Sequence, residues 1–241
     1  MRVLITRPEP DAGAFAALCR DNGIEPVIAP LMDIQIDGKA VSLSGIGALA
    51  FTSANGVRAF THNVSERALP AFAVGPATAA AARAAGFELV HTAGGDVETL
   101  VQLIDRHRAL VAGAVLHVAG TDRAGDLVGG LRAAGLTAER VVLYAALAAQ
   151  TLPEAAAGAL DDETPPAWAA LFSPRTAALF ASLVRDAGLE NRLRHVRAAC
   201  LSDAVADAAR GVEWKSVEVA ASRDAAGLMR LMIKKDAGVR A

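Results

Sequence analysis

The chain has 241 residues, of which 53% are hydrophobic and 21% are charged. This composition supplies enough apolar residues for substantial cores and excludes extensive disorder. The 24 Lys and Arg residues nearly balance the 26 Asp and Glu residues, and the sequence pI is about 6.2. Because no excess of positive charge is present, the composition predicts binding neither to nucleic acid nor to an anionic membrane.

The cysteines and the apolar runs bear on the cellular compartment. Cys19 and Cys200 lack a Cys-x-x-Cys partner and fall in a predicted helix and a predicted strand. We therefore expect both to be small buried side chains in a reducing compartment. The apolar run at 3–5 is too short for a signal-peptide core, and no later run is long enough to span a membrane. A cytoplasmic protein is expected.

Short apolar runs alternate with helical patterns along the whole chain. Strands are predicted at 3–5, 26–29, 48–51, 72–74, 87–90, 114–118, 141–144, 169–172, 198–201 and 217–219. Helices are predicted at 12–22, from 55, at 76–86 and 97–107, after the turn at 120–123 as far as 135, and at 175–184, 203–209 and 224–234. This alternation is typical of doubly wound parallel sheets.

The second half of the chain repeats the first. Residues 50–60 match residues 170–180 without a gap, so that Ser53 aligns with Ser173. Three further pairs of segments correspond, namely 73–77 with 200–204, 97–103 with 225–231, and Val3-Leu4 with Val115-Leu116. We infer that one α/β unit has been duplicated.

Two connectors, near 30–37 and 144–151, continue in extended form for longer than a sheet requires. They predict that the halves exchange segments. One flavodoxin-like lobe would then comprise 1–32 plus 152–241 and the other 38–144, with 33–37 and 145–151 as a two-stranded linker. A plain tandem arrangement fits the repeat alone equally well.

Polar turns follow four of the predicted strands. Each turn combines a hydroxyl or a glycine with an arginine near a helix start, in the groups Thr6-Arg7, Ser53 with Asn55 and Arg58, Gly120 with Arg123, and Ser173 with Arg175. For any single turn, an N-cap beside a solvated arginine is the simpler interpretation. Four such turns at the carboxyl edges of two facing sheets would line a cleft with donors suited to carboxylates.

Several common catalytic motifs are missing. The run Gly45-Ile46-Gly47 precedes a strand instead of following one, which excludes a dinucleotide fingerprint, and residues 120–125 lack the ending of a nucleotide P-loop. The five histidines show no spacing suited to a metal, so no metal site is predicted and most of them are expected at the surface or at strand ends. No nucleophile and base can be paired.

Tyr144 is the single tyrosine, and it lies where a predicted strand runs into the second connector. Ordinary packing with the hydroxyl in water is one interpretation of this residue. The other is a role in chemistry.

Taken together, these motifs resemble the uroporphyrinogen-III synthase family over essentially the full length of the chain. The segments that carry the resemblance are Leu4-Ile5-Thr6-Arg7-Pro8, Phe51-Thr52-Ser53-x-Asn55-x-Val57, Val74-Gly75-Pro76-x-Thr78, Gly120-x-x-Arg123, Tyr144 and Phe172-Ser173-Pro174. Each is common by itself, but their order and spacing are specific.

The resemblance implies a cofactor-free, cyclising lyase of tetrapyrrole and heme biosynthesis that acts as a monomer. Its substrate would be hydroxymethylbilane, which it would close with inversion of ring D through a spiro intermediate. A transient contact with hydroxymethylbilane synthase is compatible with this role. The family has no single indispensable catalytic side chain, in agreement with the missing acid–base pair.

The resemblance also implies roles for individual residues. Tyr144 would assist departure of the substrate hydroxyl. Substrate carboxylates would be bound by Thr6, Arg7, Thr52, Ser53, Asn55, Gly75, Thr78, Arg123, Ser173 and Ser202. The chain departs from the family pattern where residues 201–205 replace the usual Gly-Pro-x-Thr, since Val205 has no hydroxyl and Ser202 is its substitute.

Two other functions compete with this one. A non-catalytic sensor of small molecules can have two hinged α/β lobes as well. An enzyme that uses nucleotides is disfavoured, because the phosphate-binding loops are missing.

Overall fold

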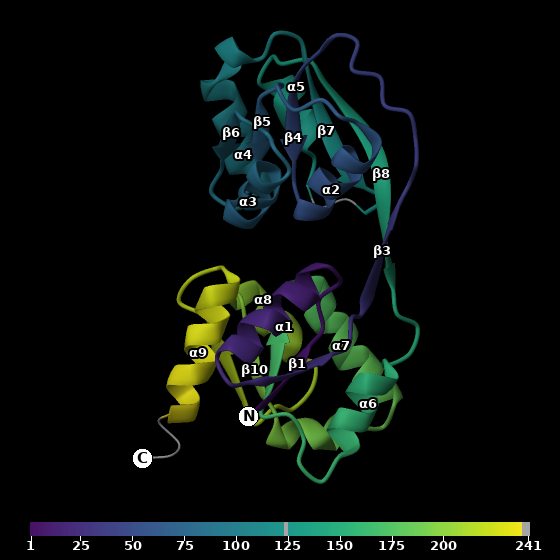
Figure 1. Cartoon of the computed structure of the whole chain (residues 1–241), viewed down its shortest axis with the longest axis vertical. Helices are drawn as coiled ribbons and strands as arrows, with labels where there is room; N and C mark the ends of the chain where they lie inside the picture. The colour runs from purple at the N-terminus through teal and green to yellow at the C-terminus, as the bar shows by residue number, and fades with distance from the viewer. Residues whose placement is uncertain (123–124, 238–241) are drawn as a thin grey trace. The chain divides into compact units, whose positions relative to one another are not determined.

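The computed structural model describes residues 1–122 and 125–237. The chain divides into two compact units. Unit 1 comprises Met1–Asp33 and Leu147–Ala241, and unit 2 comprises Ile34–Ala146. Strands β3 (Met32–Ile36) and β8 (Ala138–Ala148) are hydrogen-bonded neighbours, and each runs across the boundary between the units (Figure 1).

Unit 1 contains a five-stranded sheet of order β11-β10-β9-β1-β2. Its strands are β1 (Arg2–Ile5), β2 (Glu25–Ile28), β9 (Trp168–Leu171), β10 (Arg197–Cys200) and β11 (Ser216–Val219), and all of their pairings are parallel. The helices are α1 (Asp11–Asp21), α6 (Glu154–Asp161), α7 (Pro174–Asp186), α8 (Asp203–Ala209) and α9 (Ala225–Ala237), with a 3-10 helix, η2 (Glu190–His195).

In unit 2, β3 and β8 form one sheet with β4 (Ile46–Phe51), β5 (Ala71–Ala73), β6 (Val90–Thr92) and β7 (Ala114–Gly120). The strand order is β3-β8-β7-β4-β5-β6. The helices are α2 (Ala54–Asn63), α3 (Pro76–Ala84), α4 (Val97–Arg106) and α5 (Leu127–Ala133), with a 3-10 helix, η1 (Arg108–Leu110).

The strand orders show how the two repeats share the sheets. Strands β1 and β2 of the first repeat pair in unit 1 with β9, β10 and β11 of the second, while β7 and β8 of the second repeat pair in unit 2 with β4, β5 and β6 of the first. Numbered within the repeat, the unit 1 sheet and the unit 2 sheet without its added edge strand β3 both have the flavodoxin-like order 2-1-3-4-5. The predicted α/β fold with exchanged segments is confirmed.

Apolar side chains cover both faces of each sheet. In β1, Leu4 packs into one cluster with α7, whereas its neighbours Val3 and Ile5 pack into another with α1 and α9. In β4, Leu49 and Phe51 pack against α2 and Ala50 packs on the opposite face. Strands buried on both faces explain why the sequence shows continuous apolar runs instead of alternation.

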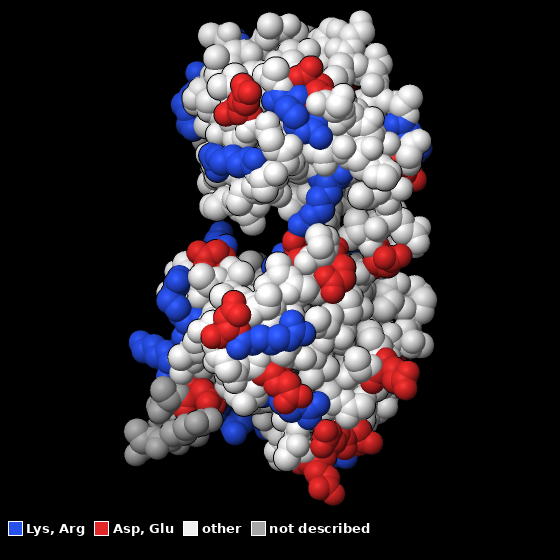
Figure 2. All heavy atoms as spheres, in the orientation of Figure 1, with Lys and Arg blue, Asp and Glu red and all other residues white. Residues whose placement is uncertain are grey.

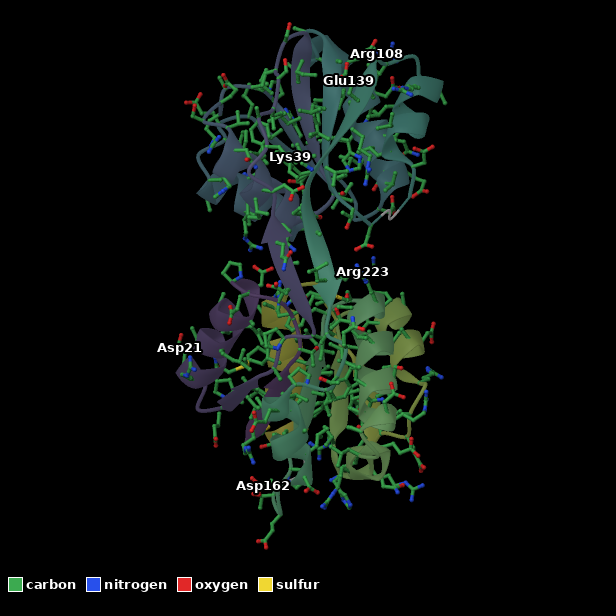
Figure 3. All side chains as sticks on the ribbon, turned by 90° about the vertical axis from the view of Figure 1, so that its right-hand side faces the viewer. Asp21, Lys39, Arg108, Glu139, Asp162 and Arg223 are labelled. Carbon is green, nitrogen blue, oxygen red and sulfur yellow. The ribbon has the colours of Figure 1, made fainter. Side chains whose placement is uncertain are left out.

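Charged side chains lie mainly on the outside of the units. The labelled residues Asp21, Arg108 and Asp162 point away from their units in Figure 3, and all three are exposed. On the face drawn in Figure 2, basic and acidic side chains are interspersed. Within residues 1–122 and 125–237, no helix combines the length and the apolar character that crossing a bilayer requires.

The clearest differences from the prediction concern one strand and one helix. The predicted strand exists as β6, but its bounds of 87–90 are wrong, because Gly86 adopts a positive φ of 92° and the Phe87 amide donates to the Ala82 carbonyl, which closes the end of α3. Strand β6 therefore begins at Val90. Helix α6 was not predicted, although Pro153 directly before it is a common helix-start signal.

Candidate active site

Ser53 occupies the turn between β4 and α2 in unit 2. Its backbone is extended, with φ −157° and ψ 157°, and its hydroxyl oxygen accepts a hydrogen bond from the Gly56 amide at 3.2 Å. This is the geometry of an N-cap, in which a short oxygen-bearing side chain satisfies an amide that has no partner inside the helix. The other amides of the first turn lie at the carboxyl edge of the sheet.

Tyr144 lies on β8 and reaches the same edge. Its hydroxyl is 2.8 Å from the Ser53 hydroxyl. The tyrosine ring packs directly against Gly120 at the end of β7, where a Cβ atom would stand only 2.7 Å from Tyr144 Cε2. A glycine is thus required at position 120 for the ring to occupy this position.

The environment of Tyr144 keeps its hydroxyl protonated. Burial raises the pKa of Tyr144 above its ordinary value of 10.0, and the hydrogen bond with Ser53 opposes the shift. The negative charge of Asp122 raises the pKa of Tyr144 further, and the positive charge of Arg140 lowers it. At neutral pH this phenol is therefore an O–H group that can donate a hydrogen bond.

His117 lies in the middle of β7 and contacts the residue before Ser53. Its Nε2 atom is 3.2 Å from the Thr52 hydroxyl, and the residue is only 8% exposed. Burial lowers the pKa of His117 to about 4, and the charge of Arg140 adds to this effect. The expectation that most histidines lie at the surface or at strand ends does not hold for this residue.

Arg140 was not among the predicted site residues either. It lies opposite His117 in the β7–β8 register, and its guanidinium donates to the Gly120 carbonyl. The β7–β8 register shifts between Ala119 and Gly120, and Tyr144 packs with Leu143 against the cluster that contains α2. Because such a shift interrupts the alternation of side chains along a strand, the four-residue spacing between Arg140 and Tyr144 does not place both on one face. No local sequence pattern therefore indicated Arg140.

The other predicted residues of unit 2 occupy the neighbouring turn or the first turn of a helix. Asn55 Oδ1 accepts a hydrogen bond from Arg58 at 2.7 Å. Gly75 is the N-cap of α3, two residues beyond β5, as Ser53 is two residues beyond β4. Thr78 is buried in α3. Arg123 lies outside the residues that the structure describes.

In unit 1 the predicted residues also gather at the carboxyl edge. Thr6 is fully buried, and its hydroxyl donates to the Ala170 carbonyl at 3.3 Å. Arg7 pairs with Asp11 at 2.8 Å and lies 4.3 Å from the centre of the Phe172 ring. These contacts tie the ends of β1 and β9 together.

Ser173 and Ser202 begin two helices of unit 1 in different ways. Ser173 caps α7, because its oxygen accepts from the Thr176 amide at 3.2 Å, and the two hydroxyls lie 2.8 Å apart. The side chain of Ser202 makes no capping hydrogen bond at the start of α8. Within the described residues, no group of three or more His, Cys, Asp or Glu side chains is arranged to hold a metal ion.

Both cysteines are free and buried, as expected from the sequence. Burial raises the pKa of Cys19 to about 11 and that of Cys200 to about 12. Neither thiol is therefore activated as a nucleophile.

Gly120→Ala tests the contact with Tyr144. The added methyl group should displace the ring, cost about 1–3 kcal/mol of stability, and return the pKa of Tyr144 towards 10.0 from a higher value. Because Tyr144 is the single tyrosine, ultraviolet titration reports its ionisation directly. In Gly158→Ala, the matched control, the new methyl group meets no atom within 4 Å and should leave this titration unchanged. Equal titration curves for wild type and Gly120→Ala would contradict the packing.

His117 should make stability depend on pH. The pKa of His117 is lowered in the folded chain from 6.5 to about 4. The neutral ring therefore contributes fully to the free energy of unfolding above pH 6.5, and this contribution is lost as the pH falls to 4. The loss should approach about 3 kcal/mol. Urea denaturation at several pH values should show a smaller loss in His117→Gln, and identical pH profiles would contradict the buried neutral imidazole.

Comparisons with known proteins identify the family of the chain. The family model described as "Uroporphyrinogen-III synthase HemD" matches residues 13–230. A curated protein of Methanocaldococcus jannaschii, named "Putative uroporphyrinogen-III synthase", is 41% identical over 58 residues, which are 24% of this chain and 24% of that protein. The matched segment thus spans about a quarter of that relative's length.

Solved structures share the fold at low sequence identity. Uroporphyrinogen-III synthetase from Helicobacter pylori has 15% identity and a TM-score of 0.62, and the match covers 97% of this chain and 99% of that one. A mutant uroporphyrinogen III synthase from Thermus thermophilus has 18% identity and a TM-score of 0.57, with 97% and 98% covered. The family match spans most of the sequence, and this chain belongs to the uroporphyrinogen-III synthase family.

Proposed function

We propose that the chain is a cyclising lyase that converts hydroxymethylbilane into uroporphyrinogen III with loss of one water molecule. The observation that carries this proposal is the Tyr144 hydroxyl, held 2.8 Å from Ser53 at the carboxyl edge of the unit 2 sheet, in a chain of this family. Ligands of open parallel sheets bind at this edge.

The reaction does not require a nucleophilic side chain. The substrate hydroxyl leaves with a pyrrole N–H proton as water, and an electrophilic azafulvene methylene remains. The substituted carbon of ring D attacks this methylene to give a spiro intermediate, and the older bond from that carbon to the ring C bridge then breaks. The freed bridge carbon bonds to the unsubstituted carbon of ring D, which inverts the ring, and the proton lost from that carbon is balanced by reprotonation of the pyrrole nitrogen. Hydroxymethylbilane also loses water unaided and closes without inversion. The protein must therefore hold the ring ends in the less favoured geometry and stabilise the developing charge.

In this proposal Tyr144 donates a hydrogen bond to the leaving hydroxyl. Ser53 accepts from the Gly56 amide, so its own proton can be directed to the tyrosine oxygen. The Tyr144 proton is then left for the substrate. The raised pKa of Tyr144 keeps that proton in place at neutral pH.

Substrate carboxylates would be bound at the carboxyl edges of both sheets. In unit 2 the donors are the first-turn amides of α2 and α3, with Thr52, Ser53, Asn55, Gly75 and Thr78. In unit 1 they are the first-turn amides of α7, with Arg7, Ser173 and Ser202. The Thr6 hydroxyl is fully buried and already donates to the Ala170 carbonyl, so it would support this edge without donating to the substrate. Amides at helix starts suit carboxylates because the helix dipole is positive there.

We propose further that the reaction needs no cofactor, because loss of water and formation of a carbon–carbon bond involve no net oxidation or reduction. The enzyme would act as a cytoplasmic monomer and contact hydroxymethylbilane synthase transiently. The two free, buried cysteines support a reducing compartment. Direct transfer would protect a substrate that closes spontaneously.

Incubation of the pure protein with freshly generated hydroxymethylbilane tests the activity. After oxidation, chromatography separates the type I and type III isomers. The proposal expects the type III isomer in excess over a protein-free control. Type I alone would overturn it and would favour a binding module without chemistry.

Tyr144→Phe removes the proposed donor and keeps the ring against Gly120. Loss of one such donor should lower kcat by about 10² to 10³ while the affinity for uroporphyrinogen III changes little. Single-turnover kinetics and equilibrium binding measure the two quantities separately. An unchanged kcat would remove Tyr144 from the mechanism.

A further inference from the structure

His117 is a buried polar side chain for which the fold itself provides no reason. It lies opposite Ala50 in the β4–β7 register. In unit 1 the residue equivalent to Ala50 is Ala170 of β9. The residue opposite Ala170 is Ile5 of β1, which is fully buried. Because an isoleucine fills this position in the other repeat, packing alone does not require a histidine in β7.

The imidazole does have one specific contact at the candidate active site. His117 Nε2 is 3.2 Å from Thr52 Oγ1, and Thr52 directly precedes the helix-capping Ser53. A threonine hydroxyl has one hydrogen to donate and two lone pairs that accept. The tautomer of His117 therefore decides which of these remains for a ligand.

The two neutral tautomers have opposite consequences. If Nε2 is unprotonated, Thr52 must donate to it and would present only lone pairs, which repel a carboxylate. If Nε2 carries the proton, it donates to Thr52 and the threonine hydrogen is left to donate outward. Burial and the charge of Arg140 both disfavour the imidazolium form by lowering the pKa of His117, so one neutral tautomer is present at neutral pH.

We infer that His117 is a positioning residue whose neutral ring carries its proton on Nε2. This N–H group donates to the Thr52 hydroxyl and so leaves the threonine hydrogen to donate to a substrate carboxylate. The inference rests on the proposed function, since it needs an anionic substrate at this edge. It gives the one buried histidine of β7 a role in substrate binding and none in proton transfer.

The tautomer can be measured without substrate. The ¹⁵N chemical shifts of the five histidine rings distinguish a protonated from an unprotonated nitrogen, and His117→Gln assigns the signal. The expected result at pH 7 is a protonated Nε2 and an unprotonated Nδ1. The reverse assignment, or a ring charged at pH 7, would overturn the inference whatever the activity of the enzyme.

Three variants test the role in substrate binding. His117→Ile places at this position the residue that β1 already has there, and should raise KM about tenfold through loss of one oriented hydrogen bond, with kcat within about twofold. His117→Gln keeps an N–H donor near the position of Nε2 and should recover most of the affinity. Thr52→Val should match His117→Ile, and the double variant should be no worse than either single one.

The controls separate the inference from the proposed function. His62→Gln makes the same chemical change at an exposed residue of α2 and should leave KM unchanged. A normal KM for His117→Ile, a reduced kcat alone, or additive effects in the double variant would overturn the inference. If wild type yields only the type I isomer, the proposed function fails. The ¹⁵N measurement of the His117 tautomer needs no substrate and still shows which atom donates in the contact between His117 and Thr52.

Discussion

The hydrogen bond between Ser53 and Tyr144 is the interaction on which the candidate active site depends. It joins the turn after β4 to β8, and the two residues are 91 positions apart in the sequence. It exists only because Gly120 leaves room for the tyrosine ring and because Ser53 caps α2 in an extended conformation. A backbone constraint and a helix cap together thus orient one hydroxyl in a partly buried environment.

The duplication supplies the same framework twice, but the two edges have diverged. Ser53 and Ser173 both cap a helix after a buried strand, as their alignment predicts. In unit 1 the adjoining polar groups are engaged with the protein itself, since Thr6 donates to a strand carbonyl and Arg7 pairs with Asp11. In unit 2 the corresponding edge has Tyr144 and the His117–Thr52 pair. This difference makes unit 2 the better candidate for the chemical step.

Much of the fold could be predicted from the sequence because each buried strand is a short apolar run that ends in a polar turn. The repeat and the two long connectors then indicated the exchange of segments between sheets. The bounds of elements were harder to predict where an apolar residue ends a helix instead of starting a strand. Phe87 is an example, because its amide closes the end of α3 and β6 begins only at Val90. Ser53 and Ser173 were recognisable as caps because the signal for a cap is local.

The remaining features of the site depend on contacts between distant segments, which no local pattern contains. The ring nitrogen of His117 meets Thr52 across 65 positions, and Arg140 reaches the carbonyl of Gly120 from the next strand. An apolar strand with a histidine in its middle does not reveal which neighbour the imidazole contacts. The role of Tyr144 could be suggested by resemblance, but its partner Ser53 required the register of the sheet.

The most direct measurement is a crystal structure of the protein with uroporphyrinogen III bound. Product carboxylates should lie on the first-turn amides of α2 and α3, and the Tyr144 hydroxyl should point at the carbon bridge that closes the macrocycle. A tetrapyrrole bound to unit 2 elsewhere than at the carboxyl ends of β4 and β5, with Tyr144 turned away from it, would contradict the account.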